Sequence, residues 1–187
     1  DADKYTLKFC HAFCPKKVAQ DVKSDVIKTD LMFVGRDKGR LGKLKAIYRF
    51  LEAKGFNLTF RIVTDVTVIN QDKDILTNDL VSLNDYNRFF LHSSAILDVN
   101  APNQTGLTVR VMSTIRDGKK LVTDNPYAAR MFNSKYRSQI FLLDSELNNL
   151  DNLPEFLSIE REAISSVDIE EYYLESWIQK LFGDLDN

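Results

Sequence analysis

Short apolar runs alternate with segments of helical periodicity along this chain, and glycines separate them. Leu31–Val34 is a continuous apolar run, and the apolar positions of Leu41–Leu51 then fall on one face of a helix. Gly55 ends that segment, and Leu58–Val63 is a second apolar run. A strand, a glycine-bearing turn, a helix and a second strand within about thirty residues predict a β-α-β unit with parallel strands.

The same alternation continues toward the C-terminus. Predicted helices span 85–91, capped by Ser82 or Asn84, and 107–116, introduced by Gly106 and ended by Gly118. Predicted strands span 95–99, 120–123 and 139–143. For each of the intervals 66–69 and 75–81, the pattern leaves open whether a short strand forms. This order predicts an α/β fold with a parallel sheet and helices on both of its faces.

The sequence beyond Asp144 has a different character. Glu155–Ser166 and Glu170–Phe182 are predicted helices, and we find no internal repeat or low-complexity linker. We therefore expect a single domain with a C-terminal helical extension. Its expected parts are residues 1–30 as a lead-in or interdomain connection, 31–150 as the main α/β domain, and 151–187 as C-terminal helices of the same domain.

Charge is unevenly distributed, although the 187-residue chain carries a net charge of only −2. Residues 1–143 hold 23 Lys and Arg against 15 Asp and Glu, a net charge of +8, whereas residues 144–187 hold 2 against 12, a net charge of −10. The excess of positive charge in residues 1–143 is compatible with binding of an anionic ligand. Nucleic-acid binding is a weaker alternative, because the cations are not interleaved with aromatic residues.

The two cysteines, Cys10 and Cys14, are too few for a disulfide framework. With His11 and the distant His92 they also make a poor zinc ligand set, so no metal is expected. No apolar run has the length of a membrane span, and the N-terminus lacks a signal-peptide core. These features predict a cytoplasmic chain with no transmembrane segment.

Three segments follow predicted strands and are expected at the carboxyl edge of the sheet, where ligands of such folds bind. The first, Gly35–Arg40, combines two glycines with three cations before a helix N-terminus, a pattern that favours an anion such as phosphate. The second, Asn103–Arg110, places Arg110 in the first turn of a helix, where a cation opposes the helix dipole unless an anion compensates it. The third, Asp124–Pro126, either bonds a ligand hydroxyl or only makes a turn.

Catalytic signatures are missing from the sequence. It has no Walker A loop, GxGxxG fingerprint, nucleophile elbow or HExxH motif, and no evident pair of carboxylates for acid–base chemistry. The residues therefore predict a binding domain for an anionic small molecule more readily than a complete active site, and the catalytic residues stay unknown.

Four ordered motifs resemble the C-terminal half of bacterial GT-B glycosyltransferases of the lipopolysaccharide or capsular polysaccharide type. They are FVGRDKGR at 33–40, SAILD at 94–98, GLTVR at 106–110 and GKKLVTDN at 118–125, and the similarity covers about residues 3–182. The resemblance implies a Rossmann-like domain that binds a nucleotide-sugar donor, with the N-terminal acceptor-binding domain missing from this chain. It further implies a hexosyltransferase-type enzyme that needs no metal cofactor and is inactive as this fragment; peripheral membrane association of the full-length protein stays open.

The resemblance also implies roles for individual residues. The donor diphosphate would be bound by Gly35, Arg36, Lys38, Arg40, Gly106, Leu107, Thr108 and Arg110, and the ribose or sugar by Asn103, Gln104 and Ser113. Ser113 stands where relatives usually have a ribose-binding Glu, and an acidic residue expected earlier in that loop is replaced by Asn103, Gln104 and Thr105. The resemblance also implies that the C-terminal segment packs partly against the other domain, with Trp177 and Phe182 exposed. The replacement of the expected Glu by Ser113, together with the C-terminal segment, leaves a second class of function open, a non-catalytic Rossmann-like module for protein interaction.

Overall fold

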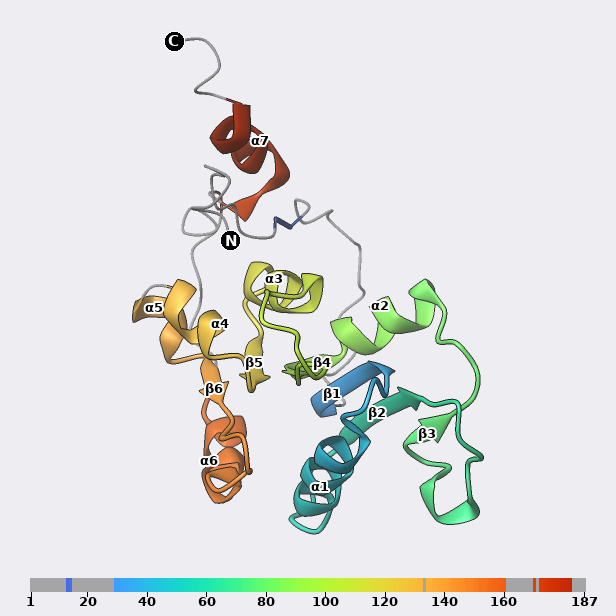
Figure 1. The fold of residues 1–187 in the computed structure, drawn as a ribbon. Coiled ribbons are helices and arrows are strands. Elements are labelled where there is room, and N and C mark those ends of the chain that lie inside the picture. The colour runs from blue at the N-terminus through green and yellow to red at the C-terminus, as the bar shows by residue number, and fades with distance from the viewer. Residues whose placement is uncertain (1–12, 15–28, 133, 161–169, 171, 183–187) are drawn as a thin grey trace.

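A six-stranded, entirely parallel sheet forms the centre of the protein in the computed structural model, which describes residues 13–14, 29–132, 134–160, 170 and 172–182 (Figure 1). The strands lie in the order β3-β2-β1-β4-β5-β6. Their bounds are β1 Thr29–Arg36, β2 Leu58–Val63, β3 Leu76–Thr77, β4 Ser93–Asp98, β5 Lys120–Thr123 and β6 Ile140–Leu142. The predicted α/β class with a parallel sheet is confirmed, and the strand order is that of a Rossmann-like fold.

The strand order reverses between β1 and β4. β1 pairs with β2 on one side, Leu31 opposite Leu58, and with β4 on the other, Leu31 opposite Ala95. The chain leaves β1 toward β2 but leaves β4 toward β5, so the two connections diverge at the carboxyl ends of these neighbouring strands. This divergence opens a crevice at the edge of the sheet, the usual ligand site of open α/β folds.

Helices cover both faces of the sheet, as predicted (Figure 1). α1 and α6 pack on the face that presents Leu31 and Phe33, whereas α2, α3 and α4 pack on the face that presents Met32 and Leu121. The alternation of neighbouring β1 side chains between the two faces follows the period of a strand. The helices are α1 Leu41–Glu52, α2 Leu83–Leu91, α3 Val109–Arg116, α4 Pro126–Met131, α5 Ser134–Arg137, α6 Leu153–Ser158 and α7 Leu174–Phe182, with short 3₁₀ turns η2 Asn70–Asp72 and η3 Leu150–Asn152.

α1 begins and ends where its sequence predicts. Its apolar positions are buried in the sheet-facing core, and Gly55 has a φ of +81°. The Gly55 N–H donates to the Glu52 carbonyl at 3.0 Å, and the Phe56 N–H donates to the Leu51 carbonyl at 3.2 Å. This pair of bonds is a Schellman motif, which requires a left-handed residue at Gly55 and directs the chain into β2.

Side-chain caps set the start of the other two long helices beside the crevice. Ser82, rather than Asn84, caps α2, because its Oγ accepts the Asp85 N–H at 3.1 Å. Thr108 caps α3 by accepting the Val111 N–H at 3.2 Å. α3 therefore begins at Val109, two residues later than the predicted start at Leu107.

The structure corrects several predicted boundaries. Residues 66–69 form no strand, and β3 is only two residues long within the interval 75–81. α6 ends at Ser158 because Ile159 is extended, so the helix predicted over 155–166 is wrong at 159–160, and 161–166 lie outside the described residues. Strand β1 already includes Thr29 and Asp30, which were expected in the lead-in. The helix predicted from Glu170 begins at Leu174.

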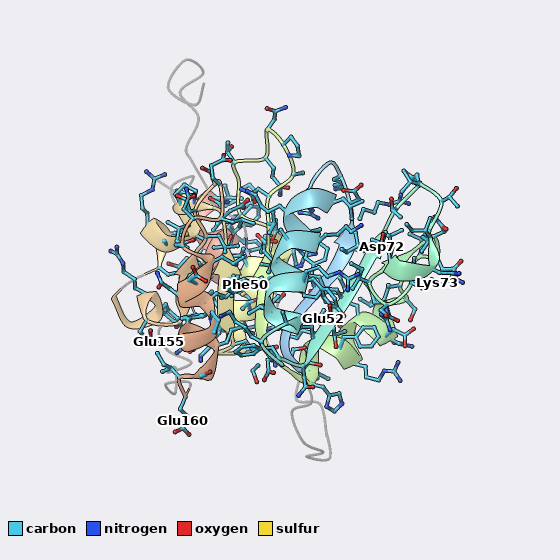
Figure 2. The ribbon with its side chains drawn as sticks, turned by 90° about the horizontal axis from the view of Figure 1, so that it is seen from below. Phe50, Glu52, Asp72, Lys73, Glu155 and Glu160 are labelled. Carbon is cyan, nitrogen blue, oxygen red and sulfur yellow. The ribbon has the colours of Figure 1, made fainter. Side chains whose placement is uncertain are left out.

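A partly buried ion pair connects α1 to the segment between β2 and β3, in which Asp72 lies (Figure 2). The Asp72 carboxylate, 6% exposed, accepts from Lys45 Nζ at 2.8 Å and lies 3.6 Å from Arg49 Nη2. Both cations belong to α1. These contacts hold a connection that contains little regular secondary structure against the helix.

Lys120 on β5 connects the sheet to α6. Its side chain is buried and its Nζ donates to the carbonyls of Phe156, Leu157 and Ile159 at the C-terminal end of that helix. The last carbonyls of a helix lack intrahelical donors and carry the negative end of its dipole, so an ammonium group stabilises them.

We expect Lys120→Met to lower the free energy of unfolding by about 1–3 kcal/mol, because it removes the donor while keeping the apolar stem. Urea denaturation followed by circular dichroism measures the change. The exposed Lys73→Met serves as the matched control and should change stability by less than about 0.5 kcal/mol. Equal effects of the two substitutions would contradict a stabilising role for Lys120.

Candidate functional site

A cavity of about 370 Å³ opens at the crevice between the carboxyl ends of β1 and β4. It is bounded by the turn before α1, the loop before α3, and the sheet-facing side of α2. Its lining residues are Lys38, Arg40, Tyr86, Gln104, Thr108, Val109, Arg110 and Ser113. The volume is within the range of small-molecule binding sites, and three of the eight lining side chains are cations.

Arg40 enters the cavity from the start of α1. The turn before it contains Lys38 with a φ of 48° and Gly39 with a φ of 79°, and the Asp37 carboxylate accepts the Arg40 N–H at 3.1 Å. The Arg40 guanidinium donates to the carbonyl of Val99 and, at 3.1 Å, to that of Arg36. Within the described part of the chain its guanidinium forms no ion pair, although the charges of Asp98, Asp124 and Asp37 act on it.

Arg110 enters the cavity from the start of α3, on the other face of the sheet. Its Nη1 donates to Asp98 Oδ1 at 3.0 Å, and its Nη2 donates to the Val34 carbonyl at 2.7 Å. Asp98 is fully buried at the end of β4 and also accepts from Thr108 Oγ1 at 3.0 Å. The compensating anion near this helix N-terminus is therefore a carboxylate of the protein itself, which explains why a cation is tolerated there.

The two guanidinium groups converge over Gly35 on β1. A Cβ atom built at this glycine would lie 2.9 Å from Arg110 Nη2 and 3.7 Å from Arg40 Nη2. Both guanidinium carbons also lie over the ring of Phe33, at 5.1 Å for Arg40 and 4.9 Å for Arg110. Gly35 thus provides the space in which two cations approach each other.

Electrostatics at this point favour an anion. Burial and then the positive charge of Arg110 lower the pKa of Arg40, and the charge of Asp98 acts in the opposite direction. Asp98 pairs with Arg110, and the charges of Asp98, Asp124 and Asp37 act on Arg40, while three of the side chains that line this partly exposed cavity are cations. A ligand with negative charge would relieve the repulsion between the two cations.

Several buried polar atoms around the cavity have no hydrogen-bond partner among the described residues. They include Nε of both Arg40 and Arg110, Oδ2 of Asp98 and Oδ1 of Asn100. Buried polar atoms in native proteins are nearly always hydrogen-bonded. Their concentration around one cavity therefore adds to the indications of a binding site.

The third predicted segment organises the loop before α3 and does not line the cavity. Asp124 accepts from Lys43 Nζ at 3.0 Å and from the Asn100 N–H at 2.8 Å. Asn125 caps α4, and its Nδ2 donates to the carbonyls of Thr105 and Gly106 at 3.3 and 3.2 Å. The segment therefore forms the start of α4, with Asn125 as its N-cap and Pro126 in its first turn, and a bond to a ligand hydroxyl stays a prediction.

Six of the predicted donor-binding residues line the cavity together: Lys38, Arg40, Gln104, Thr108, Arg110 and Ser113. The remaining five occupy other positions. Gly35 lies beneath the two guanidinium groups, and Arg36 is exposed and lies 3.7 Å from the exposed Asp65. Gly106 is bonded by Asn125, Leu107 packs against the core of α3, and Asn103 is exposed with a φ of 65°.

Tyr86 and Val109 line the cavity but were not among the predicted site residues. Tyr86 belongs to α2, which the chain places beside the crevice only through the crossover from β3 to β4. Burial raises the pKa of the Tyr86 hydroxyl, and the positive charge of Arg110 partly offsets this effect. No local sequence signal distinguishes Tyr86 from the other aromatic residues of its helix.

The arrangement provides cations and hydrogen-bonding groups. No carboxylate or imidazole is among the lining side chains, and the described residues contain no group of three potential metal ligands. Cys10 and His11 lie outside the described residues, and Cys14 is buried, with its pKa raised by burial. The lining suits binding and charge stabilisation of an anion.

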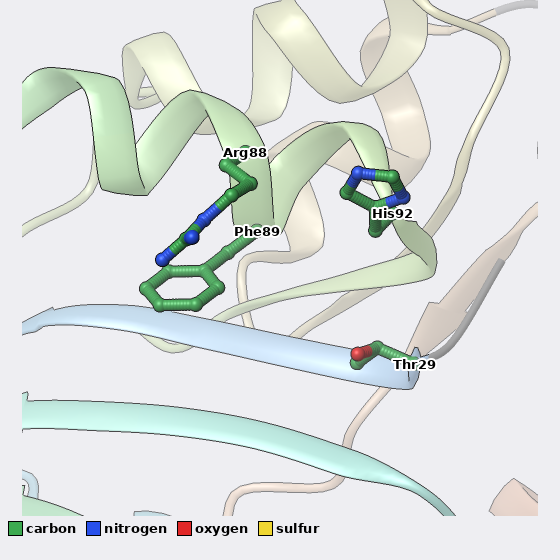
Figure 3. Close-up of a pocket in the computed structure, with 4 residues that line it drawn as sticks. All are labelled: Thr29, Arg88, Phe89 and His92. Carbon is green, nitrogen blue, oxygen red and sulfur yellow. The ribbon is translucent and has the colours of Figure 1, made fainter. Parts of the chain in front are cut away.

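A second, smaller cavity of about 270 Å³ lies at the opposite end of β1 (Figure 3). It is lined by Thr29, Arg88, Phe89 and His92. Arg88 pairs with Asp85 at 3.0 Å on its own helix, so this cavity has no comparable excess of charge. The cavity at the crevice is therefore the stronger candidate.

We expect Asn125→Ala to loosen the loop before α3, because the substitution removes two bonds to loop carbonyls. Amide exchange of residues 101–108 should accelerate about tenfold, as expected for the loss of about 1–2 kcal/mol. Hydrogen–deuterium exchange measures this local change. Asn57→Ala, at an exposed position, is the matched control, and equal acceleration in both variants would contradict the assignment.

No model of a known protein family and no curated protein matches the chain. Within the described residues, no helix is both long and apolar enough to cross a membrane. The α/β fold and the cationic cavity at its crevice are thus the established properties from which a function can be proposed.

Proposed function

We propose that this chain is the nucleotide-sugar-binding half of a GT-B glycosyltransferase of the type that builds lipopolysaccharide or capsular polysaccharide. The observation that carries the proposal is the convergence of Arg40 and Arg110 over Gly35 at the point where the strand order reverses. The ligand of this cavity would be the diphosphate of the donor. The acceptor would be bound by the other domain of such an enzyme.

A diphosphate fits the chemistry of the two helix starts. Neither α1 nor α3 has an acidic residue in its first turn, and α1 begins without a side-chain cap. At the start of α3 the buried Asp98 carboxylate compensates Arg110, whereas the first turn of α1 holds no acidic side chain, so the positive end of the α1 dipole is available to an anion. In the reaction, the cations and the helix starts would stabilise the negative charge that develops on the departing nucleoside diphosphate.

Two polar residues would bind the sugar or ribose of the donor. Gln104 and Ser113 line the same cavity as the cations. Ser113 lies three residues after Arg110 on α3, so the two side chains share one face of the helix. We assign ribose or sugar binding to this pair and not to the exposed Asn103, which lies outside the lining.

The proposal predicts that UDP or GDP binds and that Arg40→Ala weakens binding at least tenfold, because a charge-assisted contact is lost. Arg36→Ala is the matched control. Its side chain is 51% exposed and lies outside the cavity, so we expect less than a threefold change. Isothermal titration calorimetry measures both, and no detectable binding of any nucleoside diphosphate at millimolar concentration would contradict the proposal.

A second candidate function, a non-catalytic module for protein interaction, has one observation in its favour. α7 exposes Leu174, Ile178 and Phe182 at spacings of four residues, which places them on one face of the helix. Trp177 on the same helix is only partly exposed and packs against Phe13, with ring centroids 5.0 Å apart. A stable complex formed through α7 that nucleotides leave undisturbed would favour this second function.

A further inference from the structure

The Asp98 carboxylate occupies an unexpected place for a site that attracts anions. It is fully buried at the end of β4, directly behind the cavity, and one of its oxygens bonds both Arg110 and Thr108. Its negative charge opposes the binding of any anion nearby. Because the Asp98 charge disfavours an anionic ligand, we expect this carboxylate to have another role in the site.

Arg110 requires such a partner in order to stay where it is. Its guanidinium lies at the start of α3, where the helix dipole repels a cation, and close to the second cation Arg40. Arginine also has a long side chain with many rotamers, and holding it in one of them costs entropy. The bonds to Asp98 and to the Val34 carbonyl fix both terminal nitrogens of the guanidinium.

Gly35 is the other half of this arrangement. Its missing side chain leaves the space that Arg110 Nη2 occupies, since a Cβ atom there would approach to 2.9 Å. The glycine is not among those with a positive φ, so alanine is compatible with the backbone. The atom that must yield to a new methyl group is the far end of a flexible side chain, so the fold can persist while Arg110 moves.

We propose that Asp98 is a positioning residue that, with Gly35, fixes the Arg110 guanidinium beside Arg40 in the orientation that binds an anion. The inference rests on the proposed function of the cavity. This role predicts the opposite of what charge alone predicts for anion binding. Removal of the Asp98 charge alone should favour an anion, whereas loss of the position of Arg110 should disfavour it, and we expect the positional effect to dominate.

The test uses the full chain with UDP and inorganic pyrophosphate as probes in calorimetric titrations. We expect Asp98→Asn to weaken binding about tenfold, as for one lost charge-assisted contact. The control Asp65→Asn removes the same charge from an exposed side chain after β2 and should leave binding unchanged or slightly tighter. Tighter or unchanged binding by Asp98→Asn would overturn the inference.

Two further variants separate positioning from general damage to the fold. Gly35→Ala changes no charge and should weaken binding in the same direction, which keeps the inference testable if Asp98→Asn does not fold. In an Arg110→Ala background, Asp98→Asn should no longer weaken binding, because there is no guanidinium left to position. A continued tenfold loss in that background would overturn the inference.

A ligand-free measurement distinguishes this inference from the proposed function. NMR of ¹⁵N-labelled arginine side chains reports the rotation of each guanidinium, and Arg110→Lys identifies the Arg110 signals. We expect slow rotation for Arg110 in the unaltered chain and faster rotation in Asp98→Asn and in Gly35→Ala. If no anion binds but the variants show faster Arg110 rotation than the unaltered chain, only the proposed function is rejected. If Arg110 rotation is unchanged in both variants, the positioning role is rejected.

Discussion

The reversal of strand order between β1 and β4 is the constraint on which the rest of the site depends. β1 pairs in parallel with both β2 and β4, so its carboxyl end is flanked by two connections that run to opposite faces of the sheet. α1 begins on one face and α3 on the other, and both starts lie at the same edge. The cation of each helix start, Arg40 or Arg110, therefore reaches the crevice from a different face. Without the reversal, the two guanidinium groups would not meet over Gly35.

Two cations repel each other when they lie close together in a partly buried crevice. Hydrogen bonds from both guanidinium groups to nearby oxygens reduce the free-energy cost of this repulsion. The backbone carbonyls of Arg36 and Val99 accept hydrogen bonds from Arg40. The Val34 carbonyl and the Asp98 carboxylate accept hydrogen bonds from Arg110. Carbonyl oxygens solvate a guanidinium without cancelling its charge, whereas a carboxylate cancels it. The guanidinium of Arg40 thus donates to backbone carbonyls, whereas Arg110 is paired with a carboxylate. The two cations have unlike tasks, the first to attract an anion and the second to provide fixed hydrogen-bond donors.

Much of the fold follows from local sequence signals, because the signals that set it act over a few residues. The apolar face of α1, its ending at Gly55, and the buried runs of β1 and β2 were all predictable for this reason. Local signals are weaker elsewhere: they leave 66–69 open, which forms no strand, and the helix predicted over 155–166 ends early, at Ser158. Six of the eleven predicted site residues line one cavity because the loops after parallel strands meet at one edge. Tyr86 could not be predicted, since its place depends on the path of the whole β3–α2–β4 crossover.

Gly35 and Arg110 show how a residue can be singled out correctly and explained incompletely from sequence. Gly35 looked like a turn glycine, yet it lies within β1 and serves to admit a guanidinium from another element 75 residues further along the chain. Arg110 looked like a cation awaiting an anionic ligand, yet Asp98 already occupies one side of it. The guanidinium of the site that forms no ion pair among the described residues is therefore that of Arg40, which the sequence pattern marks only as one of three cations in a turn. What distinguishes it from the exposed Arg36, four residues earlier, is burial against Phe33 and the nearness of Arg110, and both depend on tertiary contacts.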